Sequence, residues 1–326
     1  MKRVTNLTLR FIGLVLFGCI AGSALALTKI QTIPLLGAGG KFGHLSMDAS
    51  GQRLFVTALK NRSIVVIDLA SGELARTLRE LLQPEDVCYL AKLNCFLVTD
   101  GRDGSCDFFD AKTFVPTGSL RLESDANIIR YDDKAKRVYV GYGLGGLSVI
   151  DPKEVKVVDD IPLDNHPEAF QLERNGPRIF VNVPSSHEIV VIDRITKTVK
   201  ARWPLGPVAG NFSMALDEAS QRLFVGCRAP GRLLVFDTTR GKQVARAALH
   251  GDCDDLFYDA KRHKIYASCG EGFLDIFTQI DKDHYSRDAA VKTAQGARTS
   301  LFDGSKLYLA VPHRDSQLAE IRVYAP

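Results

Sequence analysis

The side chains best suited to chemistry stand in seven short polar segments that return about every 40 residues along the chain. These segments contain His44, Glu85 with Asp86, Asn127, His166 with Glu168, Asn211, Asp252 with Asp254 and Asp255, and Arg298. Each segment leads into a stretch of alternating apolar residues, the pattern of a half-buried β-strand. If those strands are neighbours in space, the polar segments meet on one face of the molecule.

Three of these residues predict a site for a hard cation. Glu168, Asn211 and Asp255 offer carboxylate and amide oxygens, the ligands that Ca²⁺ and Mg²⁺ prefer. His166 or Asp254 would then serve as a general base, and the planar guanidinium of a nearby arginine suits a carbonyl or anionic oxygen. A metal that polarises a carbonyl and a base that activates water together suit the opening of a lactone.

The same residues also allow two readings without turnover. His44, Asn127, Asn211 and Arg298 would hold a small ligand in a binding protein. Polar side chains at strand starts also complete turns, or bind only ordered water. The residues alone leave catalysis, binding and a structural role open.

A repeat supplies the elements that must position these side chains. In each copy a basic or polar residue opens an aromatic, β-branched strand, and a second apolar strand follows and in most copies ends in Asp, as in Arg53–Val56 with Val66–Asp68. The aromatic anchors are Phe55, Phe96, Tyr139, Phe180, Phe224, Tyr266 and Tyr308, at steps of 41 to 44 residues. Short strands at so regular a period, with turn residues between them, indicate an all-β repeat architecture.

The repeat length predicts four antiparallel strands per copy and a seven-bladed β-propeller over residues 27–326 as one domain. The Asp that ends the third strand suits a turn, where its carboxylate accepts backbone N–H groups. The last copy stops after its third strand, while residues 27–36 form a spare strand at the start. We therefore expect the N-terminal strand to close the ring, which removes exposed sheet edges.

The repeats resemble a known family. Residues 54–57 through Asn61, with Ile64–Asp68 after them, look like the YVTN-type propeller repeat, and the order of the blades resembles the YncE-like family of exported seven-bladed propellers. The stretches 166–173, 179–184 and 254–259 are also similar to it. The resemblance covers the mature chain and implies the propeller fold. It implies no single reaction, since such propellers shade into lactonase-like and quinoprotein-like relatives.

The first 26 residues read as a secretory signal peptide. Lys2, Arg3 and Arg10 precede or flank an apolar run, and Ala24-Leu25-Ala26 is a small-x-small cleavage site. A membrane anchor and a lipoprotein signal at Cys19 are the alternatives. We expect a periplasmic or secreted monomer with no membrane span after cleavage. The formal net charge of +4 falls to about +1 when the three basic residues of the signal peptide are removed. A nearly neutral chain gives no argument for nucleic acid as a partner.

Six cysteines remain after cleavage: Cys88, Cys95, Cys106, Cys227, Cys253 and Cys269. In an oxidising compartment an even count allows disulfides. Cys227, Cys253 and Cys269 should lie near the face of the polar segments, where two of them would form a disulfide. The alternative is a soft-metal site with His250 for Zn²⁺ or Cu(I). Cys88 and Cys95 are expected as buried thiols on adjacent strands.

The sequence therefore predicts an exported binding or scaffold propeller with a ligand or metal site at one channel mouth. The alternative is a metal-dependent, lactonase-like hydrolase that uses the same site. A third reading is an interaction platform for a periplasmic protein. No glycine-rich phosphate loop, GxSxG elbow or CxxCH motif occurs in the chain, which disfavours nucleotide binding, serine-triad hydrolysis and covalent haem.

Overall fold

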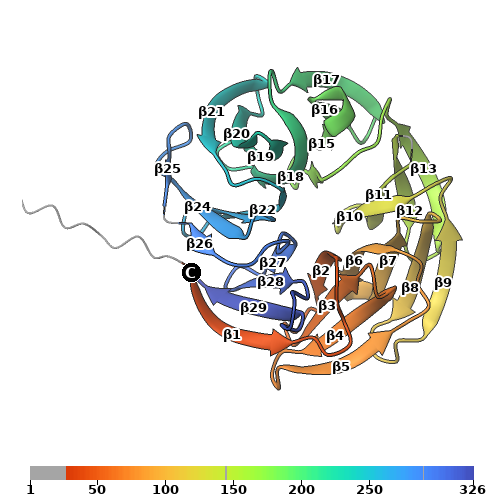
Figure 1. Ribbon diagram of the computed structural model, residues 1–326. Coiled ribbons are helices and arrows are strands. Elements are labelled where there is room, and N and C mark those ends of the chain that lie inside the picture. Colours follow the sequence, from red (N-terminus) through yellow and green to blue (C-terminus); the bar gives the residue numbers. More distant parts are fainter. Residues whose placement is uncertain (1–26, 144, 289) are drawn as a thin grey trace, which may run out of the picture.

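The structure, a computed structural model, describes residues 27–143, 145–288 and 290–326. Over these residues the strands form seven antiparallel sheets, set around a central axis like the blades of a propeller (Figure 1). The predicted all-β, seven-bladed architecture is confirmed. The predicted signal peptide, with Cys19, lies outside the described residues.

Each blade is a four-stranded sheet, with one short additional strand in blade 6. Blade 1 holds β2 (Phe42–Met47), β3 (Arg53–Ala58), β4 (Ser63–Asp68) and β5 (Glu73–Leu78). Blade 2 holds β6 (Pro84–Leu90), the 3₁₀ turn η1 (Ala91–Leu93), β7 (Cys95–Asp100), β8 (Ser105–Asp110) and β9 (Pro116–Arg121). Blade 3 holds β10 (Ala126–Asp132), β11 (Arg137–Tyr142), β12 (Gly146–Asp151) and β13 (Lys156–Pro162).

The remaining blades follow the same order. Blade 4 holds β14 (Phe170–Leu172), β15 (Arg178–Val183), η2 (Pro184–Ser186), β16 (Glu188–Asp193) and β17 (Thr198–Pro204). Blade 5 holds β18 (Ala209–Asp217), β19 (Arg222–Ala229), β20 (Gly231–Asp237) and β21 (Lys242–Ala248). Blade 6 holds β22 (Cys253–Asp259), β23 (Lys264–Cys269), β24 (Phe273–Gln279), β25 (Tyr285–Arg287) and β26 (Val291–Lys292). Blade 7 holds β27 (Ser300–Phe302), β28 (Leu307–Val311), β29 (Glu320–Ala325) and β1 (Thr28–Pro34).

The ring is closed by the two ends of the described chain. β1 pairs antiparallel with β29 as the outermost strand of blade 7, with Thr28 opposite Ala325 and Pro34 opposite Glu320. Ile33 is 1% exposed and packs into the core that blade 7 shares with blade 1. The predicted closure by the N-terminal strand is confirmed.

The core lies between neighbouring blades. The aromatic anchors Phe55, Phe96, Phe180 and Phe224 are all fully buried. Phe55 of blade 1 packs on Phe96 of blade 2, with ring centroids 4.8 Å apart. Because each anchor fills the space between two sheets, the aromatic period of the sequence is also the period of the core.

The Asp that ends each third strand is structural, as expected. Asp68 Oδ1 accepts the backbone N–H groups of Ala70 and Ser71, and Asp193 accepts those of Ile195 and Thr196. These backbone hydrogen bonds hold the pKa values of Asp68 and Asp193 below the usual range. The carboxylates complete the turns between the third and fourth strands and take no part in a site.

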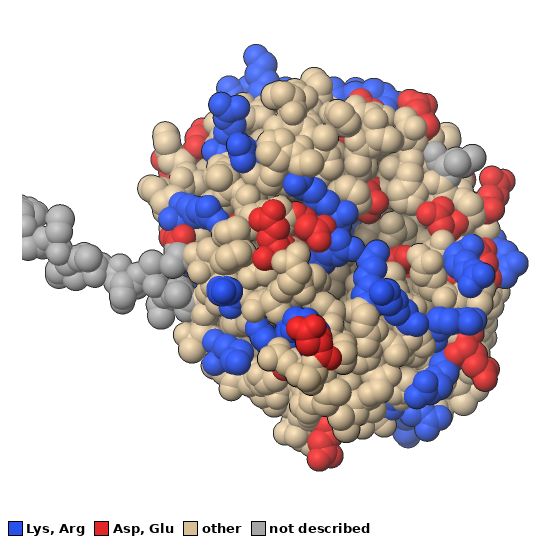
Figure 2. Space-filling model, viewed as in Figure 1, with Lys and Arg blue, Asp and Glu red and all other residues tan. Residues whose placement is uncertain are grey.

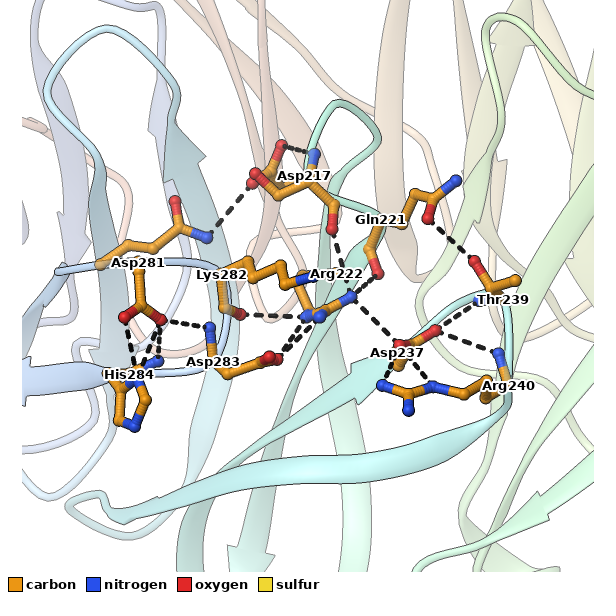
Figure 3. Close-up of polar contacts among 12 residues, drawn as sticks. Asp217, Gln221, Arg222, Asp237, Thr239, Arg240, Asp281, Lys282, Asp283 and His284 are labelled. Atoms are coloured by element: carbon orange, nitrogen blue, oxygen red, sulfur yellow. Dashed lines mark hydrogen bonds and ion pairs between the residues drawn. The ribbon is translucent and has the colours of Figure 1, made fainter.

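In several blades the basic residue that opens the second strand links one blade to the next. The Arg222 guanidinium of blade 5 is almost fully buried, and its Nε donates to the carbonyl of Lys282 in blade 6 at 2.9 Å (Figure 3). Its Nη2 donates to Asp283 Oδ1 at 2.7 Å, and Nη1 lies 3.5 Å from Asp237 Oδ2. Arg53 and Arg178 reach a carbonyl of the following blade in the same way. In blades 1, 4 and 5 this arginine therefore joins two neighbouring blades, whereas Arg137 of blade 3 pairs with Asp151 of its own blade.

The six described cysteines are all free thiols. Cys253 and Cys269 stand directly opposite each other on β22 and β23, and Cys253 Sγ lies 3.2 Å from Ser213 Oγ. His250 Nδ1 lies 2.8 Å from Asp275 Oδ1, and Cys269 Sγ lies 3.9 Å from the other oxygen of the same carboxylate. Among the described residues no group of three or more His, Cys, Asp and Glu side chains is arranged to hold a metal ion. The described part of the chain also contains no helix that is long and apolar enough to cross a membrane.

Candidate functional site

The first strand of each blade delivers one residue to a cavity at one end of the central channel. Figure 1 places β2, β6, β10, β18, β22 and β27 nearest the centre of the ring. We call the end at which these strands begin the upper mouth. Seven residues at equivalent positions line its cavity, one from each blade: Gly43, Glu85, Asn127, Glu168, Phe212, Asp254 and Arg298. The volume of this upper cavity is about 240 Å³.

Most of the residues predicted from the polar segments meet here. His44, Asn127, His166, Glu168, Asp254 and Arg298 all line the upper cavity. They come from β2, β10, β22 and the loops that precede β14 and β27, so segments more than 250 residues apart share one wall. Figure 2 shows charged side chains of both signs around the hollow at the centre of one face of the ring.

Asn211 does not share this cavity. Its side chain is fully buried, and its Nδ2 donates to Asn182 Oδ1 at 3.1 Å and to the Glu188 carbonyl at 2.9 Å. The pairing of β18 with β19 shifts register between Asn211 and Ser213, and Phe212 takes the cavity position of blade 5. A shift of one residue turns a side chain to the other face of a strand.

Asp255 is also engaged elsewhere. Its Oδ2 accepts the backbone N–H of Ser300 in blade 7 at 2.7 Å, and its Oδ1 lies 3.2 Å from His44 Nδ1. Asp86 makes the same link to the Ile129 N–H of blade 3, at 2.8 Å. The set Glu168, Asn211 and Asp255 is therefore not brought together as metal ligands.

The contact between His44 and Asp255 is an ion pair within the channel. Burial alone would lower the pKa of His44, but the Asp255 carboxylate outweighs burial and raises the pKa of His44 to about 10. His44 is therefore a charged imidazolium at neutral pH and cannot accept a proton as a base.

The cations of one cavity wall are neutralised by carboxylates. Arg298 Nη1 lies 2.7 Å from Asp252 Oδ1, and Arg298 Nε lies 3.0 Å from Asp254 Oδ2. Arg228 pairs with the same two carboxylates, and its guanidinium lies 3.5 Å from the centroid of the Phe212 ring. Two arginines and two aspartates form a neutral cluster, so Arg298 is held in place rather than left free for an anion.

Asp125 and Glu168 of the same cavity have no arginine partner among the described residues and lie near His166 instead. His166 Nδ1 lies 2.8 Å from the Gly143 carbonyl and 3.6 Å from Asp125 Oδ2. His166 Nε2 lies 3.4 Å from Asn127 Nδ2 and 4.0 Å from Glu168 Oε1. The Glu168 carboxyl makes no hydrogen bond with any described residue, although only 21% of its side chain is exposed.

Burial raises the pKa of Glu168 to about 7, with His166 opposing the shift and Asp254 adding to it. A carboxyl group that lines a cavity and titrates near neutral pH is a typical feature of a binding or catalytic site. It can accept a hydrogen bond when ionised and donate one when protonated.

The charged and aromatic residues of this cavity that the sequence prediction missed include Lys41, Asp125, Phe212 and Arg228. Lys41 and Asp125 stand directly before β2 and β10, three residues before His44 and two before Asn127. Arg228 lies near the end of β19, the second strand of blade 5. Including the residues just before the first strand and at the end of the second would have found these three, whereas the register shift at Phe212 leaves no clear signal.

No protein-family model and no curated protein sequence matches the chain. Solved structures do match. A chain in the crystal structure of the mitotic checkpoint complex superposes with a TM-score of 0.79 at 13% identity, covering 98% of this chain and 99% of that one. A chain of Kuenenia stuttgartiensis hydrazine synthase gives 0.75 at 17% identity, covering 88% and 98%. At such low identity the likeness is one of fold, and by fold this chain is a seven-bladed β-propeller.

Proposed function

We propose that the protein is an exported binding propeller that holds a small polar ligand in its upper cavity. The observation that carries the proposal is the Glu168 carboxyl, which lies in a cavity shared by all seven blades, makes no hydrogen bond with a described residue, and approaches His166 Nε2 only to 4.0 Å. A buried polar group without a partner costs free energy, and a ligand that satisfies it recovers that cost.

The ligand should carry hydrogen-bond donors. Asp125 and Glu168 contact only His166 among the described charged groups, at 3.6 and 4.0 Å, while Arg228 and Arg298 are paired with aspartates. Phe42 and Phe212 add two ring surfaces to the lining. An amino sugar or a similar small molecule with amine and hydroxyl groups fits this combination better than an acid does.

The proposed localisation of the protein is supported by its sequence, and a protein partner by the fold. The first 26 residues and the resemblance to exported YncE-like propellers support a periplasmic or secreted monomer. A scaffold role for a protein partner is the companion proposal, supported by a neighbour of the same fold in a multi-protein complex. Such a partner would dock on the loops around a mouth, as propeller loops allow.

The lactonase-like hydrolase is the second candidate. His166 Nε2 and Glu168 Oε1, 4.0 Å apart, are the two groups suited to general acid and base roles. The metal set predicted for it does not fit, because Asn211 and Asp255 are engaged in contacts between blades. Turnover of a γ-lactone that is abolished by EDTA and restored by Ca²⁺ or Mg²⁺ would establish the hydrolase instead.

The test is a thermal melt of the purified protein with glucosamine, with glucitol and with gluconate. We expect glucosamine to raise the melting temperature by mass action and gluconate to leave it unchanged. Glu168→Gln should lose the response, while Glu73→Gln, on the exposed strand β5, should keep it. A response to gluconate alone, or an equal response in Glu168→Gln, would contradict the proposed site.

A further inference from the structure

A second cavity lies at the opposite end of the channel, between blades 3 and 4. We call this end the lower mouth, because β10 and β14 end there. The lower cavity has a volume of about 460 Å³ and is lined in part by the turn that follows β10, the turn that follows β14, and Arg194 after β16. None of the residues predicted for the upper mouth lines it.

Every carboxylate that lines the lower cavity already has a partner. Asp132 Oδ1 accepts the backbone N–H groups of Lys134 and Ala135, both at 3.0 Å. Glu173 Oε1 accepts a hydrogen bond from Arg178 Nε at 3.0 Å, a residue outside the cavity. The third, Asp133, lies within 3.0 Å of the ammonium groups of Lys92 and Lys136.

The cations of the lower cavity are not neutralised in this way. Arg130 forms no ion pair with any described carboxylate, and its Nη1 donates only to the Ile129 carbonyl at 2.7 Å. The Arg174 side chain makes no hydrogen bond or ion pair within the described residues. Lys134 Nζ donates only to the Arg174 carbonyl and the Asn175 side chain. Three of the four cations that line the cavity therefore form no ion pair with a described carboxylate.

Arg194 adds a buried donor to this set. Its Nη2 donates to the Gly176 carbonyl at 2.9 Å, but its Nη1 is buried without a hydrogen-bond partner and lies 3.4 Å from Asp132 Oδ2. A buried guanidinium nitrogen without a partner is costly, and an acceptor oxygen placed in the cavity would satisfy it.

Arg130 connects the lower cavity with the channel. It also lines a small space of about 70 Å³ inside the ring, together with His44 and Glu168. The Arg130 side chain packs against Phe170, with its guanidinium 5.7 Å from the ring centroid. One guanidinium edge is thus fixed by packing and by the Ile129 carbonyl, which leaves the other edge for a ligand.

We propose that the lower cavity is a binding site for an oxyanion, held by Arg130 and Arg194 and closed by Arg174 and Lys134. A guanidinium matches the two oxygens of a carboxylate or phosphate, and the flexible side chains at the rim supply further charge. The shared chemistry is an anionic oxygen group on a small molecule. The cavity volume exceeds that of inorganic phosphate and leaves room for an organic part.

The experiment is calorimetric titration of the purified protein with inorganic phosphate and, separately, with succinate, at constant ionic strength set with sodium chloride. We expect saturable binding of at least one of the two. Arg130→Gln should weaken it at least tenfold, and Arg174→Gln should weaken it several-fold. Arg174 is exposed, so this variant keeps its fold if Arg130→Gln does not. Phosphate alone or succinate alone would identify the source of the anion.

Two matched variants locate the site. Arg76→Gln removes an exposed cation on the outer strand β5 and should leave binding unchanged. Asp125 lines the upper cavity but not the lower one, so Asp125→Asn should also leave anion binding unchanged. The result of this experiment therefore does not depend on whether the upper cavity binds a ligand. Absence of saturable binding by both anions, or equal binding in Arg130→Gln and Arg174→Gln, would overturn the proposal.

Discussion

The two mouths of the channel use their charges in opposite ways. At the upper mouth Arg228 and Arg298 are neutralised by Asp252 and Asp254, and the carboxyl of Glu168 makes no hydrogen bond with a described residue. At the lower mouth the carboxylates have partners, and the Arg130 guanidinium forms no ion pair with a described residue. The difference teaches that the charged residues of the blades divide into two kinds, those that join blades and those that face the channel.

A change in a joining residue should have the largest effect. Arg222→Leu removes the buried guanidinium that joins blade 5 to blade 6, and Asp237 and Asp283 each lose an ion-pair partner. We expect a loss of about 3–5 kcal/mol in the free energy of unfolding, measured with urea. Arg130→Gln, which removes a leftover cation, should cost less than about 1 kcal/mol. Equal losses in the two variants would remove the distinction between joining and channel-facing charges.

The next effect concerns the pH dependence of stability. The pKa of Glu168 is raised by burial to about 7, above its usual value of 4.5, so the folded state binds the proton more tightly than the unfolded state. Stability should therefore fall as the pH rises from about 4.5 through 7, by up to about 3 kcal/mol. Glu168→Gln should flatten this fall and be more stable than the parent at pH 8, as thermal melts across the pH range would show. A steeper fall in the variant would contradict the assignment.

A smaller effect is expected at His44. Asp255 raises the pKa of His44 to about 10 against the effect of burial, so the ion pair stabilises the fold below pH 6.5 and loses its effect as the pH rises through 10. His44→Gln should therefore be less stable than the parent at pH 6, by about 2 kcal/mol, and the gap should close near pH 10.5. The measurement is urea unfolding at both pH values. A gap that widens with pH would show that His44 is neutral in the folded state.

The fold could be predicted in detail from the sequence because it depends on patterns that are local along the chain. The aromatic period from Phe55 to Tyr308 gave the blade count, and the missing last strand gave the closure by β1. The turn role of residues such as Asp68 also followed from local chemistry. These features depend on spacing along the chain and need no knowledge of the opposite side of the ring.

The sites were predicted less well because they depend on register and on pairing between distant blades. Asn211 was expected in the cavity, but a register shift in β18 puts Phe212 there. Asp255 was expected as a metal ligand, but its carboxylate accepts a hydrogen bond from the backbone N–H of Ser300 in the next blade. That Arg130 forms no ion pair becomes clear only when the partners of every neighbouring carboxylate are known. A sequence does not show these partners.

The opposite charge of the two mouths can be tested directly by diffraction from crystals soaked in rubidium bromide, since both ions scatter anomalously. We predict that rubidium lies in the upper cavity beside Glu168 and Asp125, and that bromide lies in the lower cavity beside Arg130 and Arg194. Bromide in the upper cavity, or rubidium in the lower one, would contradict the account.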